Sequence, residues 1–334
     1  MEDNLQRDID KGTSTVVSIL RYLAVIVPVF QIITILLNWS NCRLLAKFLN
    51  NWGSIQNNFN RIFSGFYARN NFGFQIESRT CLNNLESCKK WHSAVICAYC
   101  VIPTIAAELL VISFVEGGPG FWEELLMFLG MYGHYQLLEA LEDVKTFLIC
   151  MDLKRAMRNI RMGIDFQLRW DKVAESTVLS WRQLICQLQT QTRLAGEYLK
   201  PIQLTFLINI ILNGTACLYL SLNIPRDNRV STYISALCAG LCIALLGRLF
   251  VKSIIAEQIL AEEIHLVEDL VSMDTSNFSE IVLKQLEMTI NWIAHRPSHI
   301  NLGNYAILRK QLFLGILSLV ITYLIVLMQF YQTR

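Results

Sequence analysis

Polar side chains that could hydrogen-bond a small molecule stand within two apolar stretches of this sequence. Glu108 lies in the stretch 94–115, and Asn209 and Asn213 lie one helical turn apart in the stretch 201–222. Carboxylates and amides are costly in such surroundings and are commonly functional. We therefore name Glu108 and Asn209 as candidate ligand contacts. The alternative is that Glu108 is paired or protonated, and that the two asparagines hold neighbouring helices together.

A second group of polar side chains, rich in aromatic rings, falls in the stretch 121–150. It comprises Tyr132, His134 and Tyr135. Aromatic side chains with a polar tip are good contacts for small molecules, so these three residues are also candidate ligand contacts. Hydrogen bonding between helices is the alternative for them.

No pattern in the sequence indicates catalysis or metal binding. Cys97-x-x-Cys100 lacks a second cysteine pair, and a Pro-broken turn separates His295 from His299. The serine-hydrolase and zinc-protease signatures are missing from the sequence, and so is a pair of intramembrane aspartates. The net charge of +2 comes without a basic block that could follow a phosphate backbone. We expect no enzyme activity, no metal, no cofactor and no nucleic-acid partner.

The composition is that of a polytopic membrane protein. Of 334 residues, 53% are hydrophobic and only 17% are charged, whereas soluble domains have about 25% charged residues. A bilayer core needs about 20 apolar helical residues. Six segments meet that length, so the expected fold is an all-α membrane helix bundle; they are 16–37, 94–115, 121–150, 201–222, 231–251 and 311–330.

The charges of the connecting segments predict the orientation of the bundle. Three long segments hold 20 Lys and Arg residues and the alternating set holds 5; the first set is 38–93, 151–200 and 253–310, and the second is 1–15, 116–120, 223–230 and 331–334. Because Lys and Arg accumulate on the cytoplasmic side, the long segments are predicted to be cytoplasmic. Both chain ends are then predicted to be extracellular.

The long cytoplasmic segments have helical patterns of their own. Segments 170–200 and 256–269 are predicted to continue the neighbouring spans, and 278–294 has apolar residues at helical spacing, namely Ile281, Leu286, Ile290 and Ile293. Amphipathic helices beside a membrane usually bury one face on each other. We expect a packed cytoplasmic base, completed by neighbouring subunits.

The final predicted span ends in Thr322-Tyr323, five apolar residues and then Gln329-Phe330. This pattern resembles the C-terminal signature of insect gustatory receptors. Two other regions share the resemblance. The charged segment 257–263 with the later Arg296-Pro297 is similar to the family's split last helix, and residues 41–50 are similar to the stretch after its second span. Segment 16–37 would then be that second span, and the family's first span would be absent.

The resemblance implies a ligand-gated, poorly selective cation channel in the plasma membrane of sensory neurons. Four like or related subunits, in contact with membrane lipid, would surround a pore lined by the last helix, and small-molecule tastants would bind among the other helices. The chain would divide into a ligand-binding bundle, anchor helices and a pore helix, at 1–252, 253–310 and 311–334.

The side chains of the last helix are compatible with that role. Tyr323, Val326, Gln329 and Phe330 fall along one broad stripe. Four Gln329 amides could partly replace the hydration of an ion, and Val326 with Phe330 could form a hydrophobic constriction. Taken alone, such a stripe more often packs against another helix, and the family resemblance favours the pore.

Two other classes of membrane protein remain as alternatives. A G-protein-coupled receptor needs a cytoplasmic C-terminal tail, whereas the charge bias places this C-terminus outside. A transporter, or a non-channel partner subunit, is the second alternative. Transporters tend to have internal repeats with broken helices at matching positions, and the sequence shows no such symmetry.

Overall fold

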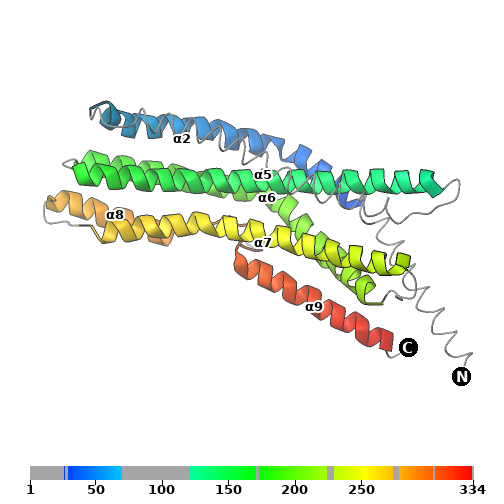
Figure 1. The fold of residues 1–334 in the computed structure, drawn as a ribbon. Coiled ribbons are helices and arrows are strands. Elements are labelled where there is room, and N and C mark those ends of the chain that lie inside the picture. The colour runs from blue at the N-terminus through cyan, green and yellow to red at the C-terminus, as the bar shows by residue number, and fades with distance from the viewer. Residues whose placement is uncertain are drawn as a thin grey trace, which may run out of the picture.

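The computed structural model of the chain is a bundle of long helices that run side by side over much of its length (Figure 1). The structure describes residues 26, 29–69, 121–170, 173–223, 229–273, 278–303 and 305–332. The helices are α2 (Cys42–Arg69), α5 (Phe121–Trp170), α6 (Glu175–Asn223), α7 (Arg229–Val271), α8 (Glu280–His295) and α9 (Lys310–Gln332). The helix Val29–Ser40 precedes α2 and is bent by 50° against it. The predicted all-α fold class is confirmed.

Three of these helices are long and apolar enough to cross a membrane, and a fourth span is possible at the bend before α2. The three are α6, α7 and α9, and they contain the predicted spans 201–222, 231–251 and 311–330. The bent pair Val29–Ser40 and Cys42–Phe63 overlaps the predicted span 16–37.

The two other predicted spans fare differently. The segment 94–115 lies outside the described residues. The segment 121–150 forms the first part of α5, which continues without a break to Trp170.

Two of the membrane-length helices are far longer than a bilayer requires. α6 has 49 residues and α7 has 43, whereas about 20 residues cross the hydrocarbon core. Each therefore has a membrane part and a second part that continues into the predicted base, as the segments 170–200 and 256–269 indicated. α6 tolerates Pro201 in its interior, and its second half slants away from α5 toward α9 (Figure 1).

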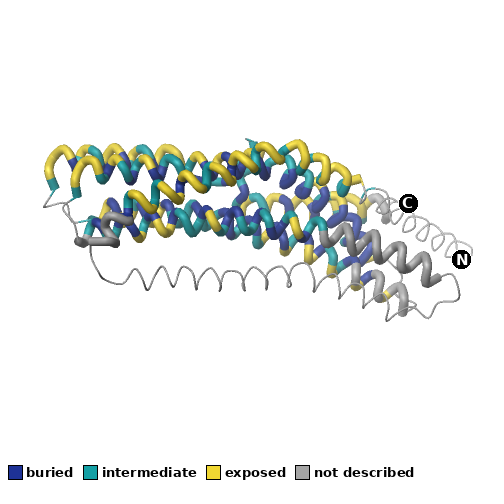
Figure 2. The backbone as a smooth tube through the Cα atoms, turned by 90° about the horizontal axis from the view of Figure 1, so that it is seen from above, coloured by how far each residue is buried: buried dark blue, intermediate teal, exposed yellow. Residues whose placement is uncertain are grey.

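The largest hydrophobic core contains residues of α2, α5, α6, α7, α8 and α9 and of the segment that joins α8 to α9. Trp181 of α6 is fully buried there and its indole Nε1 donates to Gln167 Oε1 at 2.6 Å. α2 buries Phe48, Ile55 and Phe63, which fall on one side of a helix. Figure 2 shows how buried and exposed positions alternate along the helices, as one-sided packing requires.

α8 confirms the predicted helix at 278–294, but its buried face is shifted from the predicted one. Ser279 caps it by accepting a hydrogen bond from the Val282 N–H at 3.4 Å. Val282, Leu286 and Ile293 are buried, whereas Ile281 is exposed. The prediction for Ile281 was wrong because the spacing from Leu286 to Val282 is one helical turn, while Ile281 lies further round the helix.

A short structured segment joins α8 to α9. Asn301 and Ile307 form an antiparallel bridge, and Gly303 at its turn has a φ of 68°, which favours glycine. The segment is pressed against α6, where a Cβ on Gly196 would lie 2.7 Å from the Asn301 carbonyl oxygen. On the other side, Glu263 of α7 accepts hydrogen bonds from the Ser298 N–H and, at 2.9 Å, from Ser298 Oγ.

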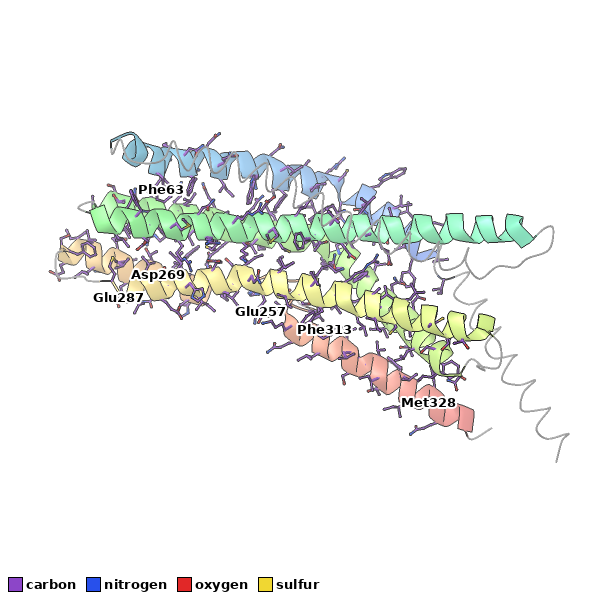
Figure 3. The ribbon with its side chains drawn as sticks, in the orientation of Figure 1. Phe63, Glu257, Asp269, Glu287, Phe313 and Met328 are labelled. Atoms are coloured by element: carbon purple, nitrogen blue, oxygen red, sulfur yellow. The ribbon has the colours of Figure 1, made fainter. Side chains whose placement is uncertain are left out.

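Figure 3 relates these parts to the two ends of the bundle. Phe63, Asp269 and Glu287 lie toward the end at which α8 packs, and Met328 lies toward the opposite end. Phe313 lies between them, near Glu257. The chain thus has a base end, at which α8 packs, and a membrane end that holds the apolar parts of α6, α7 and α9. The large core extends into both ends.

Candidate functional site

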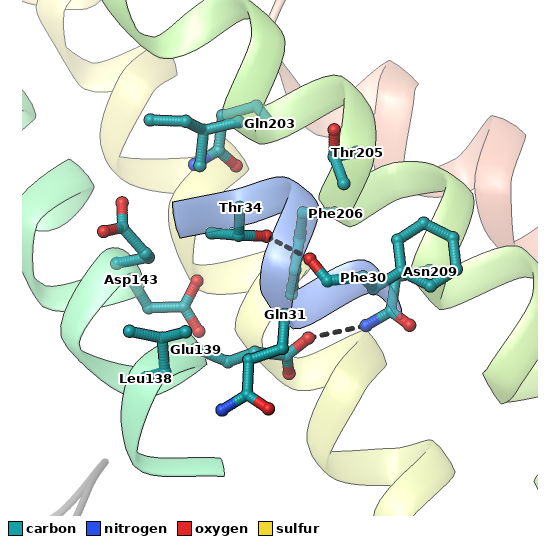
Figure 4. Close-up of a pocket in the computed structure, with 12 residues that line it drawn as sticks. Phe30, Gln31, Thr34, Leu138, Glu139, Asp143, Gln203, Thr205, Phe206 and Asn209 are labelled. Carbon is teal, nitrogen blue, oxygen red and sulfur yellow. Dashed lines mark hydrogen bonds between the residues drawn. The ribbon is translucent and has the colours of Figure 1, made fainter. Parts of the chain in front are cut away.

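A small cavity lies between the helix Val29–Ser40, α5 and α6 (Figure 4). Its volume is about 30 Å³, which is room for about two water molecules. Twelve residues line it, and eight of them are polar or charged; the twelve are Phe30, Gln31, Thr34, Leu138, Glu139, Glu142, Asp143, Ile202, Gln203, Thr205, Phe206 and Asn209. The wall thus offers many hydrogen-bonding groups, and convergent polar groups of this kind fix the orientation of a ligand.

One donor of the cavity wall is unsatisfied. Gln31 Nε2 is buried without a hydrogen-bond partner among the described residues. Its neighbour Thr34 uses its hydroxyl within its own helix, donating to the Phe30 carbonyl at 2.8 Å. A buried amide N–H without a partner costs free energy, so water or a ligand oxygen in the cavity would stabilise it.

A network of buried charges adjoins the cavity. On α5, Glu139 and Asp143 lie one turn apart, and on α7 so do Arg248 and Lys252. Arg248 contacts Glu139 Oε2 at 3.0 Å and Asp143 Oδ2 at 3.4 Å, while Lys252 Nζ contacts Asp143 Oδ1 at 2.6 Å. Both cations are almost fully buried. Because removing either partner would leave a buried charge unpaired, the network fixes the register of α5 against α7.

α6 joins this network through two residues. Asn209 Nδ2 donates to Glu139 Oε1 at 2.6 Å, and the Phe206 ring lies under Lys252 Nζ, 3.3 Å from the ring centroid. An ammonium over an aromatic face is attracted by the ring quadrupole. Glu139, Asp143, Phe206 and Asn209 also line the cavity, so a change in its contents acts directly on the charges that hold three helices together.

The structure brings only one of the predicted ligand residues to this cavity. Asn209 lines it, and its side chain is also engaged by Glu139 and Asn213. Glu108 lies outside the described residues. Tyr132, His134 and Tyr135 lie in the part of α5 whose side chains are outside the described set; their role stays a prediction.

Sequence reasoning missed the charge network, although a signal for it exists. It treated Glu139 only as an interruption of an apolar span and did not use Asp143, Arg248 or Lys252. Two acids four residues apart on one predicted helix, and two bases four residues apart at the end of another, are complementary in spacing. That match is a signal in the sequence for the pairing of α5 with α7.

α9 presents a second site, on the side turned away from the bundle. Its inner face is formed by Ile316 and Val320, which are buried against the core. Ile316 lies one turn before Val320, so the opposite side of the helix is defined by geometry. That outer side carries exposed polar or small residues over the length of the helix, interleaved with the exposed apolar residues Leu314, Ile321 and Ile325; the polar or small ones are Gln311, Gly315, Ser318, Thr322 and Gln329.

Of the four predicted pore residues, helix geometry places Gln329 on this outer side and Val326 at its edge, whereas Tyr323 and Phe330 lie nearer to the inner face. Val326 and Gln329 are exposed. Tyr323 is half exposed, but helix geometry places it nearer to the inner face than Thr322. The side chain of Phe330 is outside the described set. Thr322, which entered the prediction only through the family motif, donates its hydroxyl to the Ser318 carbonyl at 2.8 Å.

An outward polar stripe is unusual on a helix as apolar as α9. Lipid tails cannot hydrogen-bond amides or hydroxyls, and small or polar residues in membrane helices favour contacts with other helices or with water. The outer side of α9 is therefore suited to face a neighbouring subunit or an aqueous path.

Comparison with solved structures identifies the fold. The insect olfactory receptor OR5 from Machilis hrabei matches with a TM-score of 0.55 and 14% identity, covering 96% of this chain and 87% of that one. The same receptor in complex with eugenol matches with a TM-score of 0.54, also at 14% identity, with the same coverage. No protein-family profile and no curated protein matches the sequence. The chain has the helix-bundle fold of this insect receptor.

Proposed function

We propose that the chain is one subunit of a ligand-gated, poorly selective cation channel of the plasma membrane, and that its ligands are small molecules. The observation that carries the proposal is the polar stripe on the outer side of α9. Four copies arranged with this side inward would line a path with Gln311, Ser318, Thr322 and Gln329, all of them exposed within one chain. Amide and hydroxyl rings of this kind partly replace ion hydration without demanding one ion.

Two further observations support the proposal. The fold is shared with an insect olfactory receptor, of which one structure is a complex with eugenol. The C-terminal pattern from Thr322 to Phe330 resembles the gustatory signature. We therefore propose a taste receptor of sensory neurons, which responds to tastants as a homomeric or heteromeric tetramer with related subunits, and whose C-terminus is extracellular.

The cavity between α5, α6 and the helix Val29–Ser40 is the proposed ligand subsite within the described part of the bundle. Gln31 Nε2 and Asn209 would offer it hydrogen bonds, and Phe30 and Phe206 apolar contact. Because the cavity is small, a tastant must widen it, and the widening would displace groups of the adjoining charge network. Glu108, Tyr132, His134 and Tyr135 remain proposed ligand contacts of the same bundle.

The pore assignment is tested by ion permeation. The full chain is expressed in cells without native chemoreceptors, alone and with related subunits, and currents are recorded during application of a tastant panel. We expect ligand-evoked cation currents. Gln329→Ala should change the relative permeability of Na⁺, K⁺ and Ca²⁺ while the half-maximal ligand concentration stays within about twofold. An unchanged permeability series would remove Gln329 from the pore.

The ligand subsite is tested by a variant that should change the ligand dose–response but not the ion permeability. Gln31→Ala removes an unsatisfied cavity donor and should shift the ligand dose–response by about tenfold, as loss of a hydrogen bond of about 1.4 kcal/mol does, without a change in permeability. Ser40→Ala on the same helix is the matched control, since Ser40 is exposed and donates only to the Leu37 carbonyl. Equal dose–response shifts in both variants would argue against this cavity.

A further inference from the structure

The outer side of the bend before α2 carries an ordered row of side chains. Leu36 is exposed on the helix Val29–Ser40, and Trp39, near the end of that helix, is 74% exposed. Arg43 and Lys47 follow on α2, and both are exposed. Along the chain the row therefore passes from apolar through aromatic to cationic. That is the order of groups that a membrane leaflet presents from its hydrocarbon core to its headgroups.

Packing on the other side of α2 holds this row outward. Phe48 and Ile55 are buried, and Gln191 Nε2 of α6 donates to the Phe48 carbonyl at 2.6 Å. Arg43 and Lys47 lie on the side of the helix away from Phe48. α2 therefore cannot rotate to bury the two cations without losing its contact with α6.

Charge complementarity identifies what this row would bind. The sequence has no Asp or Glu from Lys11 through Ile76, so α2 itself supplies no counter-charge. On α5, Glu142 is already engaged by Lys145 and by Asn38, whose Nδ2 donates to it at 2.9 Å. Within the described part of the chain, no carboxylate forms an ion pair with Arg43 or Lys47. Among the described residues, the two exposed cations therefore remain available to an anion that approaches from outside the subunit.

We propose that Trp39, Arg43 and Lys47 form a binding site for the headgroup of an anionic phospholipid in the cytoplasmic leaflet. The indole of Trp39 lies at the depth of the glycerol and headgroup region, where tryptophan is favoured. The two cations contact the phosphate and its attached anionic group, each strengthening binding by about fivefold near a charged surface. The site rests on the proposed orientation of the chain and is independent of channel activity.

The test measures lipid binding to the purified full chain by native mass spectrometry, with phosphatidylserine as the probe and phosphatidylcholine as the neutral comparison. We expect the wild type to bind phosphatidylserine more tightly than phosphatidylcholine. The double variant Arg43→Gln with Lys47→Gln should weaken phosphatidylserine binding by about 25-fold and leave phosphatidylcholine binding unchanged. Trp39→Ala should weaken the binding of both lipids.

Arg61→Gln is the matched control on the same helix. Arg61 is exposed like Arg43 and Lys47 but lies about 21 Å further along α2 than Lys47, beyond the reach of a headgroup at the bend. Its removal should leave phosphatidylserine binding unchanged. Equal losses for Arg61→Gln and the double variant, or no loss for the double variant, would overturn the proposal. Thermal unfolding of each variant in detergent checks that the fold is intact. Failure of the channel recordings leaves this outcome unaffected, because lipid binding is read without current.

Discussion

Two apolar helices of this chain, α6 and α9, are both long enough to cross a membrane, but they differ in how much of themselves they bury. In the most apolar stretch of α6, 67% of the residues are buried within the chain, whereas in that of α9 only 11% are buried against the described residues. Yet α9 has the higher mean hydropathy in that stretch, 2.4 against 1.6. In a membrane protein, hydrophobicity therefore does not decide which helix is central, since lipid solvates an apolar surface as well as protein does. α6 is packed mainly against other helices of the same chain, whereas the outer side of α9 is available for contact with lipid, water or another subunit.

The largest expected loss of stability comes from truncating a buried residue of α6, and it tests the contrast between α6 and α9. Trp181→Ala removes a fully buried side chain and leaves Gln167 Oε1 without its indole donor. We expect it to lower the free energy of unfolding by about 4 kcal/mol. Leu314→Ala on the exposed side of α9 should change it by about 0.5 kcal/mol or less. Chemical denaturation of the detergent-solubilised protein measures both, and equal losses would contradict the contrast between the two helices.

The next effect concerns the charge network that ties α5 to α7. Among the described residues, Asp143→Ala leaves Arg248 and Lys252 buried with Glu139 as their remaining counter-charge, and it should cost about 3 kcal/mol. The double variant Asp143→Leu with Lys252→Met replaces the closest pair by apolar groups and should recover most of that loss. The same denaturation experiment measures both variants. A double variant as unstable as Asp143→Ala would mean that the pair is required for more than charge balance.

Two glycines, one on α6 and one on α9, test how closely each helix is packed against its neighbours. Gly196 of α6 is in close contact with the Asn301 carbonyl, whereas a Cβ on Gly315 of α9 has no atom within 4 Å among the described residues. Gly196→Ala should therefore cost about 2 kcal/mol through overpacking. Gly315→Ala should stabilise the isolated subunit by about 1 kcal/mol through helix propensity.

The same Gly315 variant also tests what covers α9. If the substitution weakens the assembled oligomer in size-exclusion chromatography while stabilising the separated subunit, the outer side of α9 lies against a neighbouring subunit. An oligomer that is unaffected places Gly315 toward water or lipid.

The smallest effect is a pH dependence at the base. Burial raises the pKa of Glu263 above its usual 4.5, although hydrogen bonds from Ser298 and Gln189 oppose the rise. The folded chain therefore holds this proton more tightly than the unfolded chain. The resulting stabilisation is complete below pH 4.5 and is lost as the pH rises through the raised pKa. Glu263→Gln cannot ionise and should lack this loss, so unfolding free energies of the two proteins should diverge as the pH rises from 4.5. Parallel pH profiles would contradict the assignment.

Composition and periodicity predicted α6, α7, α8, α9 and the first part of α5, but not α2 or the remainder of α5. They did not predict the partners of the helices. The run of apolar residues in 201–222 and 311–330 predicted α6 and α9 because length and hydropathy are local properties. Which helix is surrounded is not a local property: the polar residues of α9 are visible in the sequence, but the buried Ile316 and Val320 are needed to define which side of the helix faces outward. The buried side of α8 shows the same limit at smaller scale, since Ile281 and Val282 are both apolar and only the packing distinguishes them.

Of the candidate site, only a residue that is conspicuous by itself was predicted. Asn209 was identified because an amide in an apolar stretch is conspicuous. Gln31 and Thr34 also stand among apolar residues, in the predicted span 16–37; they were missed because nothing in that segment alone indicates that they face α5 and α6. The network of Glu139 and Arg248 needed two helices to be considered together, and single-segment reasoning treats each charge as an interruption.

The bridge between Asn301 and Ile307 has a mechanical consequence for the last helix. Its segment is fastened to α7 through Ser298 and to α6 through Gly196, and Lys310 at the start of α9 pairs with Glu257 at 3.3 Å. The first turn of α9 is thus held by contacts with α6 and α7, and the rest of the helix can tilt about it. Gln329 lies about 29 Å along α9 from Lys310, so a tilt of about 5° displaces that end by about 2.5 Å while the first turn stays still. A displacement of that size at Gln329 would widen a pore lined by this residue, and it needs no unfolding and no sliding of the helices at the base.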